Sequence, residues 1–123
     1  MNAKPEKALL LDADHLKKYT LGDLALEREV LGMFIDQSKL YVNRLQSPKD
    51  AKDWGEAAHS LKGSASGVGA FKIAQRAAQL EKVDEPFNSS VCTAMLALLL
   101  TDLEATEVAI IYHLDNSTEA TFI

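Results

Sequence analysis

The residue of this sequence with the clearest chemical potential is His59, in the segment Ala57-Ala58-His59-Ser60-Leu61-Lys62-Gly63-Ser64-Ala65. An α-helix advances about 100° per residue, and this spacing gathers the apolar and small side chains on one face: Trp54, Ala57, Ala58, Leu61, Ala65 and Val68. His59 falls at the centre of the opposite, polar face. The sequence therefore predicts a helix that presents one histidine to solvent.

Two glycines flank His59 at the positions one helical turn away, Gly55 and Gly63. Each costs a helix roughly 1 kcal/mol relative to alanine, so their placement suggests that a partner must approach the imidazole ring closely. The alternative is that both glycines are incidental and that His59 is an ordinary surface residue.

A neutral imidazole at cytosolic pH is a nucleophile that can accept a phosphoryl group. Lys62, three residues after His59, could neutralise part of the arriving negative charge, and Gly63 would leave room for the donor. A protein of this kind needs no nucleotide site or metal of its own, because its partner can supply the electrostatic clamp that phosphoryl transfer requires.

Other site chemistries find little support. His15 and His113 lie far from His59 and from each other without metal-ligand spacing, and we expect structural or surface roles for both. Ser60 points about 100° away from His59 on a helix, so the two do not form a hydrolytic pair. The glycines after residue 62 lack the preceding strand of a phosphate-binding loop.

Composition fits one globular domain. The chain has 123 residues, 47% of them hydrophobic, and a net charge of −5, which argues against general nucleic-acid binding. The single cysteine, Cys92, excludes an internal disulfide and is expected in the core. Residues 1–7 lack the apolar stretch of a signal peptide, and Ala94–Leu100 is too short to cross a bilayer, so we expect a cytoplasmic protein.

The remaining pattern is helical throughout. Asp12 and Asp23 are expected N-caps of the first two helices, and Ser47-Pro48 is a start signal for the third. The expected helices span about residues 13–19, 24–46, 49–66, 70–84 and 88–114. Short links favour antiparallel neighbours. We therefore predict an all-α, antiparallel four-helix bundle with a short extra N-terminal helix, in a domain over residues 9–114 between a flexible lead-in (1–8) and a polar C-terminal tail (115–123).

The segment His59-Ser60-Leu61-Lys62-Gly63-Ser64-Ala65, with Gly69-Ala70 and Leu80-Glu81 downstream, resembles the histidine-containing phosphotransfer (HPt) domain of bacterial two-component phosphorelays. Leu21-Gly22-Asp23 and Phe34-Ile35-Asp36-Gln37 are also similar to the opening helices of that family, so the likeness covers about residues 9–114. The resemblance implies a helical bundle in which His59 is phosphorylated through its distal ring nitrogen. It further implies that Lys62 helps to hold the phosphoryl group and that Gly63 keeps the histidine accessible.

In some relatives a glutamine on the next helix hydrogen-bonds near the histidine, and Glu81 occupies the corresponding place here. A carboxylate pointing inward would repel phosphate, so we do not expect Glu81 in that role; Gln37 and Gln79 are the weaker substitutes. Trp54 and Phe71 lie outside the motif, and we expect both in the core.

The resemblance implies a free-standing, monomeric phosphoryl carrier rather than an enzyme. It would accept phosphate from the receiver domain of a hybrid sensor kinase and pass it to a response regulator, with Mg²⁺ only in the receiver and no cofactor of its own. Leu26, Val30 and Met33 form a candidate apolar patch for docking the receiver, or else pack against the first helix.

Two alternatives remain open. The chain could be the phosphorylatable domain of a chemotaxis-type histidine kinase, or a helical binding module that is not phosphorylated. The sequence does not identify the kinase, the regulator, the signal or the net direction of phosphoryl flow.

Overall fold

The computed structural model describes residues 10–120, and side chains through Ser117. This part of the chain contains five helices and no strand: α2 (Ala13–Thr20), α3 (Leu24–Gln46), α4 (Ala51–Val68), α5 (Phe71–Glu81) and α6 (Ser90–Ala120). The predicted all-α fold, a four-helix bundle with a short N-terminal helix, is confirmed. The lead-in predicted for residues 1–8 lies outside the described residues.

The first two helices begin at the predicted caps. The Asp12 carboxylate accepts the backbone N–H of His15 at 3.1 Å, and the Asp23 carboxylate accepts that of Leu26 at 3.1 Å. Each bond satisfies one of the backbone donors that the first turn of a helix leaves without a partner. Both starts were recognisable in the sequence because each capping aspartate directly precedes a run of helix-forming residues.

The start of α4 differs from the prediction, which placed the cap at Ser47 and the helix at 49–66. The cap is Asp50, whose carboxylate accepts the Asp53 N–H at 2.8 Å, and the helix runs from Ala51 to Val68. Ser47 instead ends α3 by donating its N–H to the Asn43 carbonyl at 3.2 Å. Lys49 donates its N–H to the Asp53 carboxylate at 3.0 Å, which holds the intervening bend.

The turn between α4 and α5 depends on Gly69. Its φ of +86° belongs to the left-handed region, and a Cβ atom there would lie 2.8 Å from the Asp12 carbonyl oxygen. The Asp12 N–H donates to the Gly69 carbonyl at 2.9 Å. Glycine is therefore required both by the backbone conformation and by the close approach of the N-terminal segment.

The last two helices end elsewhere than predicted. α5 stops at Glu81 rather than near residue 84, because Lys82 and Val83 donate to carbonyls three residues back and tighten the turn before Pro86. α6 continues to Ala120, beyond the predicted end at residue 114 and into the segment expected to fray. No glycine or proline interrupts the chain between residues 88 and 123, so nothing local stops the helix.

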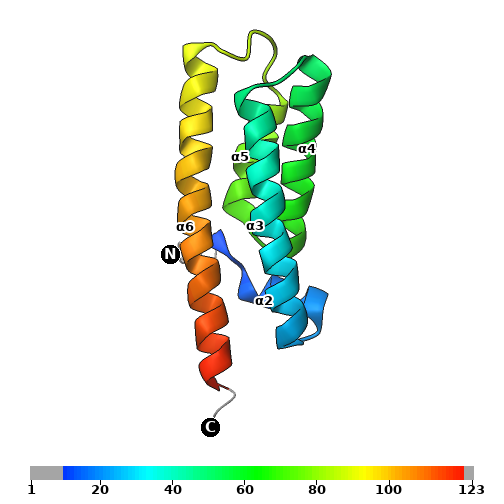
Figure 1. Cartoon of the computed structure of the whole chain (residues 1–123), viewed down its shortest axis with the longest axis vertical. Coiled ribbons are helices and arrows are strands. Elements are labelled where there is room, and N and C mark those ends of the chain that lie inside the picture. The colour runs from blue at the N-terminus through cyan, green and yellow to red at the C-terminus, as the bar shows by residue number, and fades with distance from the viewer. Residues whose placement is uncertain (1–9, 121–123) are drawn as a thin grey trace, which may run out of the picture.

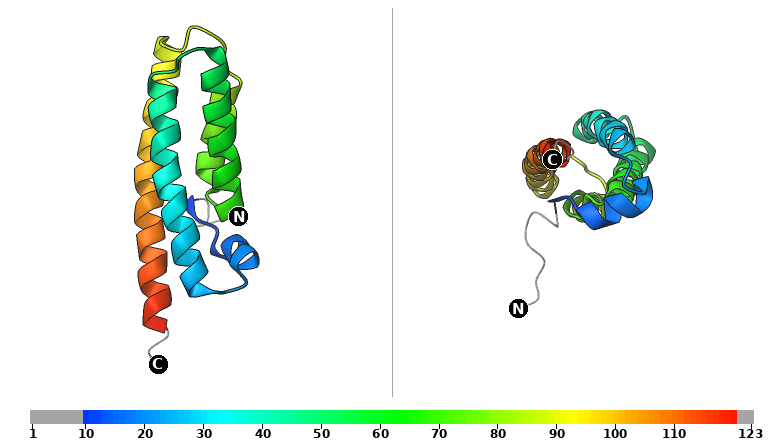
Figure 2. Two further views of the ribbon diagram at one scale, coloured as in Figure 1. Left: turned by 45° about the vertical axis from the view of Figure 1, so that its right-hand side comes forward. Right: turned by 90° about the horizontal axis from the view of Figure 1, so that it is seen from below.

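The four long helices surround one core, and α4 and α6 lie diagonally across it (Figure 1; Figure 2, right). α4 packs against α3 and α5, α6 packs against the same two helices, and α2 closes the end of the bundle against α3 and α4. The largest fully buried side chains come from all five helices: Leu16, Leu31, Leu45, Trp54, Leu61, Ile73, Leu80, Leu99 and Ile110. Small buried residues of α4 and α5, among them Ala58, Ala65 and Ala77, let these two helices pack closely.

Of the two aromatic residues predicted in the core, Trp54 is buried there and Phe71 is not. Trp54 is fully buried, and its indole N–H donates to the Leu80 carbonyl at 2.8 Å. Phe71 is only half-buried and meets the ring of His15 edge-on at 5.1 Å, so its placement in the core was wrong. Phe71 begins α5 at the end of the bundle, where the core gives way to solvent. Cys92 is buried as predicted.

Candidate functional site

His59 lies on the solvent face of α4, with 69% of its side chain exposed. The six apolar and small residues predicted on the opposite face are all buried: Trp54, Ala57, Ala58, Leu61, Ala65 and Val68. The helix is therefore oriented by its apolar face, and the imidazole is left where a visiting protein can reach it. Lys62 lies on the same face, 40% exposed.

The two glycines beside His59 are not required by packing. A Cβ atom added to Gly55 or to Gly63 would meet no atom within 4 Å. Neither glycine has a positive φ, so the backbone does not demand them either. Their effect is confined to the space above the helix surface, where any longer side chain would stand next to the imidazole ring.

Glu81, the last residue of α5, completes the surroundings of His59. One of its carboxylate oxygens lies 3.0 Å from His59 Nδ1, and the other lies 3.2 Å from Lys62 Nζ. The Glu81 carboxylate therefore contacts both His59 and Lys62, the two α4 residues that the sequence predicts for phosphoryl transfer. About 30% of its side chain is exposed.

The environment of Glu81 favours its ionised form. The hydrogen bond from the Lys62 ammonium lowers the pKa of Glu81 most strongly, partial desolvation opposes that effect, and the bond with His59 lowers the pKa further. An ionised carboxylate only accepts hydrogen bonds. The nitrogen of His59 that faces it must therefore carry the proton, which leaves Nε2, in the neutral ring, with a free lone pair.

The position of Glu81 follows from the α4–α5 hairpin. The chain reverses at Gly69, so α5 runs back along α4 and its last residue lies beside His59. The bond from Trp54 Nε1 to the Leu80 carbonyl also joins the two helices near the end of α5.

The expectation that Glu81 stays away from His59 is thus wrong. Its charge is balanced by Lys62 and directed at an N–H group, so it does not act as an isolated anion. Gln37 and Gln79, the substitutes considered, are both exposed, and within the described part of the chain neither forms a hydrogen bond with His59.

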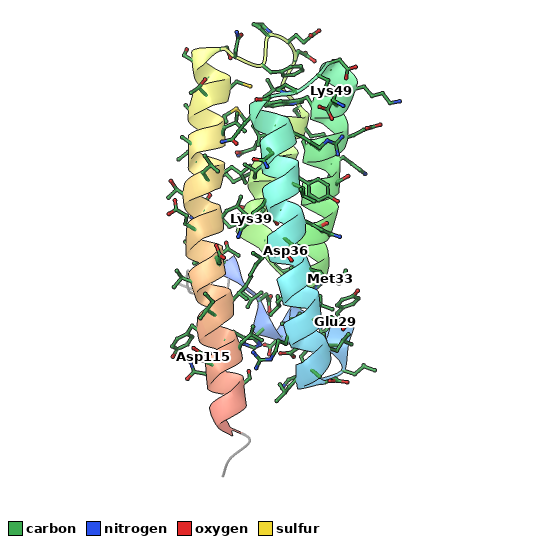
Figure 3. All side chains as sticks on the ribbon, viewed as in Figure 1. Glu29, Met33, Asp36, Lys39, Lys49 and Asp115 are labelled. Atoms are coloured by element: carbon green, nitrogen blue, oxygen red, sulfur yellow. The ribbon has the colours of Figure 1, made fainter. Side chains whose placement is uncertain are left out.

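A groove of about 320 Å³ borders the site on the α3 side. Gly63 and Gly67 of α4 form one wall, Val30 and Met33 of α3 form the other, and Tyr19 of α2 closes one end. Figure 3 shows Met33 on the side of α3 away from α6. Of the predicted docking patch, Leu26 and Met33 are exposed, whereas Val30 is partly buried against the core.

The other two histidines are placed apart from this site. His113 Nε2 lies 2.9 Å from the buried carboxylate of Glu27, which also accepts the Thr20 hydroxyl at 3.2 Å. His15 is half-buried against Phe71. Both therefore lie where a structural role is expected, His113 through its contact with Glu27 and His15 through its contact with Phe71.

Among the described residues, no group of three or more histidine, cysteine, aspartate or glutamate side chains is arranged to hold a metal ion. In the same part of the chain, none of the helices combines the length and the apolar character needed to cross a membrane.

An all-helical bundle with one exposed histidine, supported by a carboxylate and a lysine, defines a class of phosphoryl-accepting carrier domains. The chain matches the family model of the Hpt domain over residues 29–108 and belongs to that family. Hpt domains are the phosphocarrier modules of phosphorelays, where they exchange phosphoryl groups with receiver domains. Searches among curated proteins and among solved structures gave no significant match.

Proposed function

We propose that this protein shuttles a phosphoryl group between two receiver domains, with His59 Nε2 as the acceptor. The observation that supports the proposal is the contact between Glu81 and Nδ1 of His59, whose side chain is 69% exposed. An ionised carboxylate at Nδ1 favours the tautomer in which Nε2 keeps a free lone pair. The partner classes are a receiver domain of a hybrid sensor kinase and one of a response regulator, both in the cytoplasm.

The transfer step needs no proton movement. The Nε2 lone pair attacks the phosphorus of an aspartyl phosphate, the new P–N bond forms, and the P–O bond to the aspartate breaks with its electron pair remaining on the carboxylate. The ring then carries a positive charge, because Nδ1 keeps its proton. Glu81, 3.0 Å from that nitrogen, stabilises the charge. Reversal of the same step delivers the phosphoryl group to the next receiver.

Lys62 supplies the positive charge nearest to the arriving phosphoryl group. Its ammonium rests on Glu81 in the unphosphorylated protein, 3.2 Å from the carboxylate, at the end of a flexible stem. We propose that it turns toward the phosphoryl oxygens once they arrive. The proposal places the divalent cation of the reaction in the receiver partner, and gives this chain no cofactor of its own.

The groove beside Gly63 is the docking surface that we propose for the receiver. It presents apolar side chains from α3 opposite Gly63, which follows His59 by one helical turn, and apolar contacts of this kind are common in protein interfaces. Gly63 must stay small for the receiver to bring its aspartate to Nε2. Gly63→Leu should therefore slow transfer while leaving the fold intact, since its Cβ has open space.

The test is incubation of the protein with a phosphorylated receiver domain, followed by acid and alkali treatment of the labelled product. Phosphohistidine is labile in acid and stable in base, so label with that profile in the wild type and none in His59→Gln supports the relay. A histidine kinase with ATP forms the second arm. Label from the kinase but from no receiver would favour a chemotaxis-type kinase domain, and no label in either arm would favour a binding module.

A further inference from the structure

The solvent face of α6 is apolar along most of its length, unlike the exposed faces of the other helices. The exposed or half-exposed residues concerned, here called the α6 stripe, recur at alternating intervals of three and four: Val91, Ala94, Leu98, Thr101, Ala105, Val108 and Tyr112. The four largest of them keep between 48% and 67% of their surface in contact with solvent. This spacing is the pattern by which one helix packs along another.

The opposite face of α6 is already occupied. Leu99, Thr106 and Ile110 are fully buried against the bundle, so the helix is apolar on two sides and the bundle covers only one. A helix that is apolar all round is normally buried all round. Between residues 87 and 123 the chain contains no lysine or arginine, and Glu104 is the acidic residue of α6 that follows the stripe's Thr101 by one turn.

A groove of about 720 Å³ lies along the C-terminal half of the stripe. Leu10, Leu11 and Ala13 form one side, and Ala105, Val108 and Tyr112 of α6 form the other. The N-terminal half of the stripe has the opposite shape, because Val91 and Leu98 protrude from it. One molecule therefore carries both a depression and the side chains that would fill it.

We propose that the α6 stripe is the interface of a symmetric homodimer in which the two α6 helices run antiparallel. A two-fold axis near Thr101 places Leu98 opposite Ala105 and Val91 opposite Tyr112, so that each large residue meets the groove of the other copy. Such a contact is isologous and closes after two subunits. This arrangement replaces the monomer expected from the sequence.

The size of the surface suits a second copy. The exposed part of the stripe amounts to roughly 500 Å² per chain, or roughly 1,000 Å² for the pair, about the smallest area found in specific interfaces. A parallel pair of helices would instead set Ala105 against Ala105 and leave both grooves empty. It would also bring the two copies of Asp115 together, near the C-terminal end of α6 (Figure 3).

The dimer leaves phosphotransfer unobstructed. α4, which carries His59, lies diagonally across the bundle from α6, so the α6 stripe faces away from the phosphorylation site (Figure 2, right). The inference does not depend on the proposed function, and each can fail alone.

Sedimentation equilibrium of the full chain at about 100 µM tests the proposal. We expect twice the chain mass of 13.5 kDa for the wild type. Leu98→Glu and Val108→Glu should each raise the dimer dissociation constant by roughly tenfold or more, because each buries a charge without a partner. Leu40→Glu, at an exposed leucine of α3, is the matched control and should have no effect.

Disulfide trapping tests the orientation. Leu98→Cys mixed with Ala105→Cys should cross-link on mild oxidation, whereas Leu98→Cys alone should not, and Cys92 is buried. Three results would each overturn the proposal. The first is a monomeric wild type at about 100 µM. The others are a dimer that persists in both glutamate variants although circular dichroism shows them folded, and efficient cross-linking of Leu98→Cys with itself.

Discussion

Replacing Glu81 with alanine removes the carboxylate that holds the ring of His59 in one tautomer. In the wild type this oxygen lies 3.0 Å from Nδ1, and a hydrogen bond to an ionised group contributes about 1.5–3 kcal/mol when water is excluded. His59 is 69% exposed and Glu81 30% exposed, so solvent screening reduces the contribution to about 1 kcal/mol. That energy corresponds to about a fivefold change in the ratio of the two tautomers.

The assay is long-range ¹H–¹⁵N NMR of the imidazole ring, which distinguishes a protonated Nδ1 from a protonated Nε2. We expect Glu81→Ala to lower the ratio of the Nδ1–H to the Nε2–H tautomer about fivefold, and the rate of phosphotransfer from a receiver to fall by no more than that factor. The tautomer ratio of Glu81→Gln should lie between those of the wild type and Glu81→Ala, because the glutamine amide oxygen still accepts the Nδ1 proton but carries no charge. Unfolding by urea, followed through Trp54, checks that each variant is folded.

Glu56→Gln is the matched control. Glu56 is an exposed carboxylate one turn before His59 on the same helix, but its partners are Arg44 and Lys52. This variant should leave the tautomer ratio unchanged. If Glu81→Ala changes that ratio by less than about twofold, or if Glu56→Gln changes it as much, the reasoning about Glu81 is refuted.

The same carboxylate should make stability depend on pH in acid. The Lys62 ammonium, and to a smaller extent His59, hold the pKa of Glu81 below its ordinary value of 4.5. A lowered pKa in the folded state means that the stabilisation is complete above pH 4.5 and is lost as the pH falls through the folded value. The difference in unfolding free energy between the wild type and Glu81→Gln should therefore be constant above pH 5 and shrink below about pH 4. A difference that stays the same in acid would contradict this.

Three further changes test other parts of the structure. Lys62→Ala should slow phosphotransfer by roughly three- to tenfold with less than about 1 kcal/mol lost from the free energy of unfolding, because its ion pair with Glu81 lies at the surface. Gly69→Ala should lower the free energy of unfolding in urea by about 2 kcal/mol or more, because Gly69 has a positive φ and an added Cβ would clash with a backbone carbonyl. The control Gly32→Ala lies in a helix with open space and should be neutral or stabilising. His113→Leu should lower the free energy of unfolding by about 3 kcal/mol, because it leaves the buried Glu27 carboxylate without its N–H donor. Adding Glu27→Leu should recover most of that loss. If the effects of the two substitutions simply add, the pairing is refuted.

The existence of the helices and the exposure of His59 were predictable because both depend on short-range order. The apolar residues of α4 repeat with the helical period, and any packing that buries them leaves His59 outside. The caps at Asp12 and Asp23 were found for the same reason. The start of α4 was placed wrongly because Ser47 and Asp50 are both good caps, and the choice depends on where α3 ends.

The sequence by itself determined which residues turn inward on each helix, and so determined an all-helical carrier with a free histidine. Only the tertiary structure decided which side chains from different helices meet: Glu81 reaches His59 across 22 residues of chain, and Glu27 reaches His113 across 86. It also decided which apolar face of α6 the bundle leaves in solvent. The physical reason is that a helical period fixes directions around one axis, whereas contacts between helices depend on the rotation and offset with which whole helices pack.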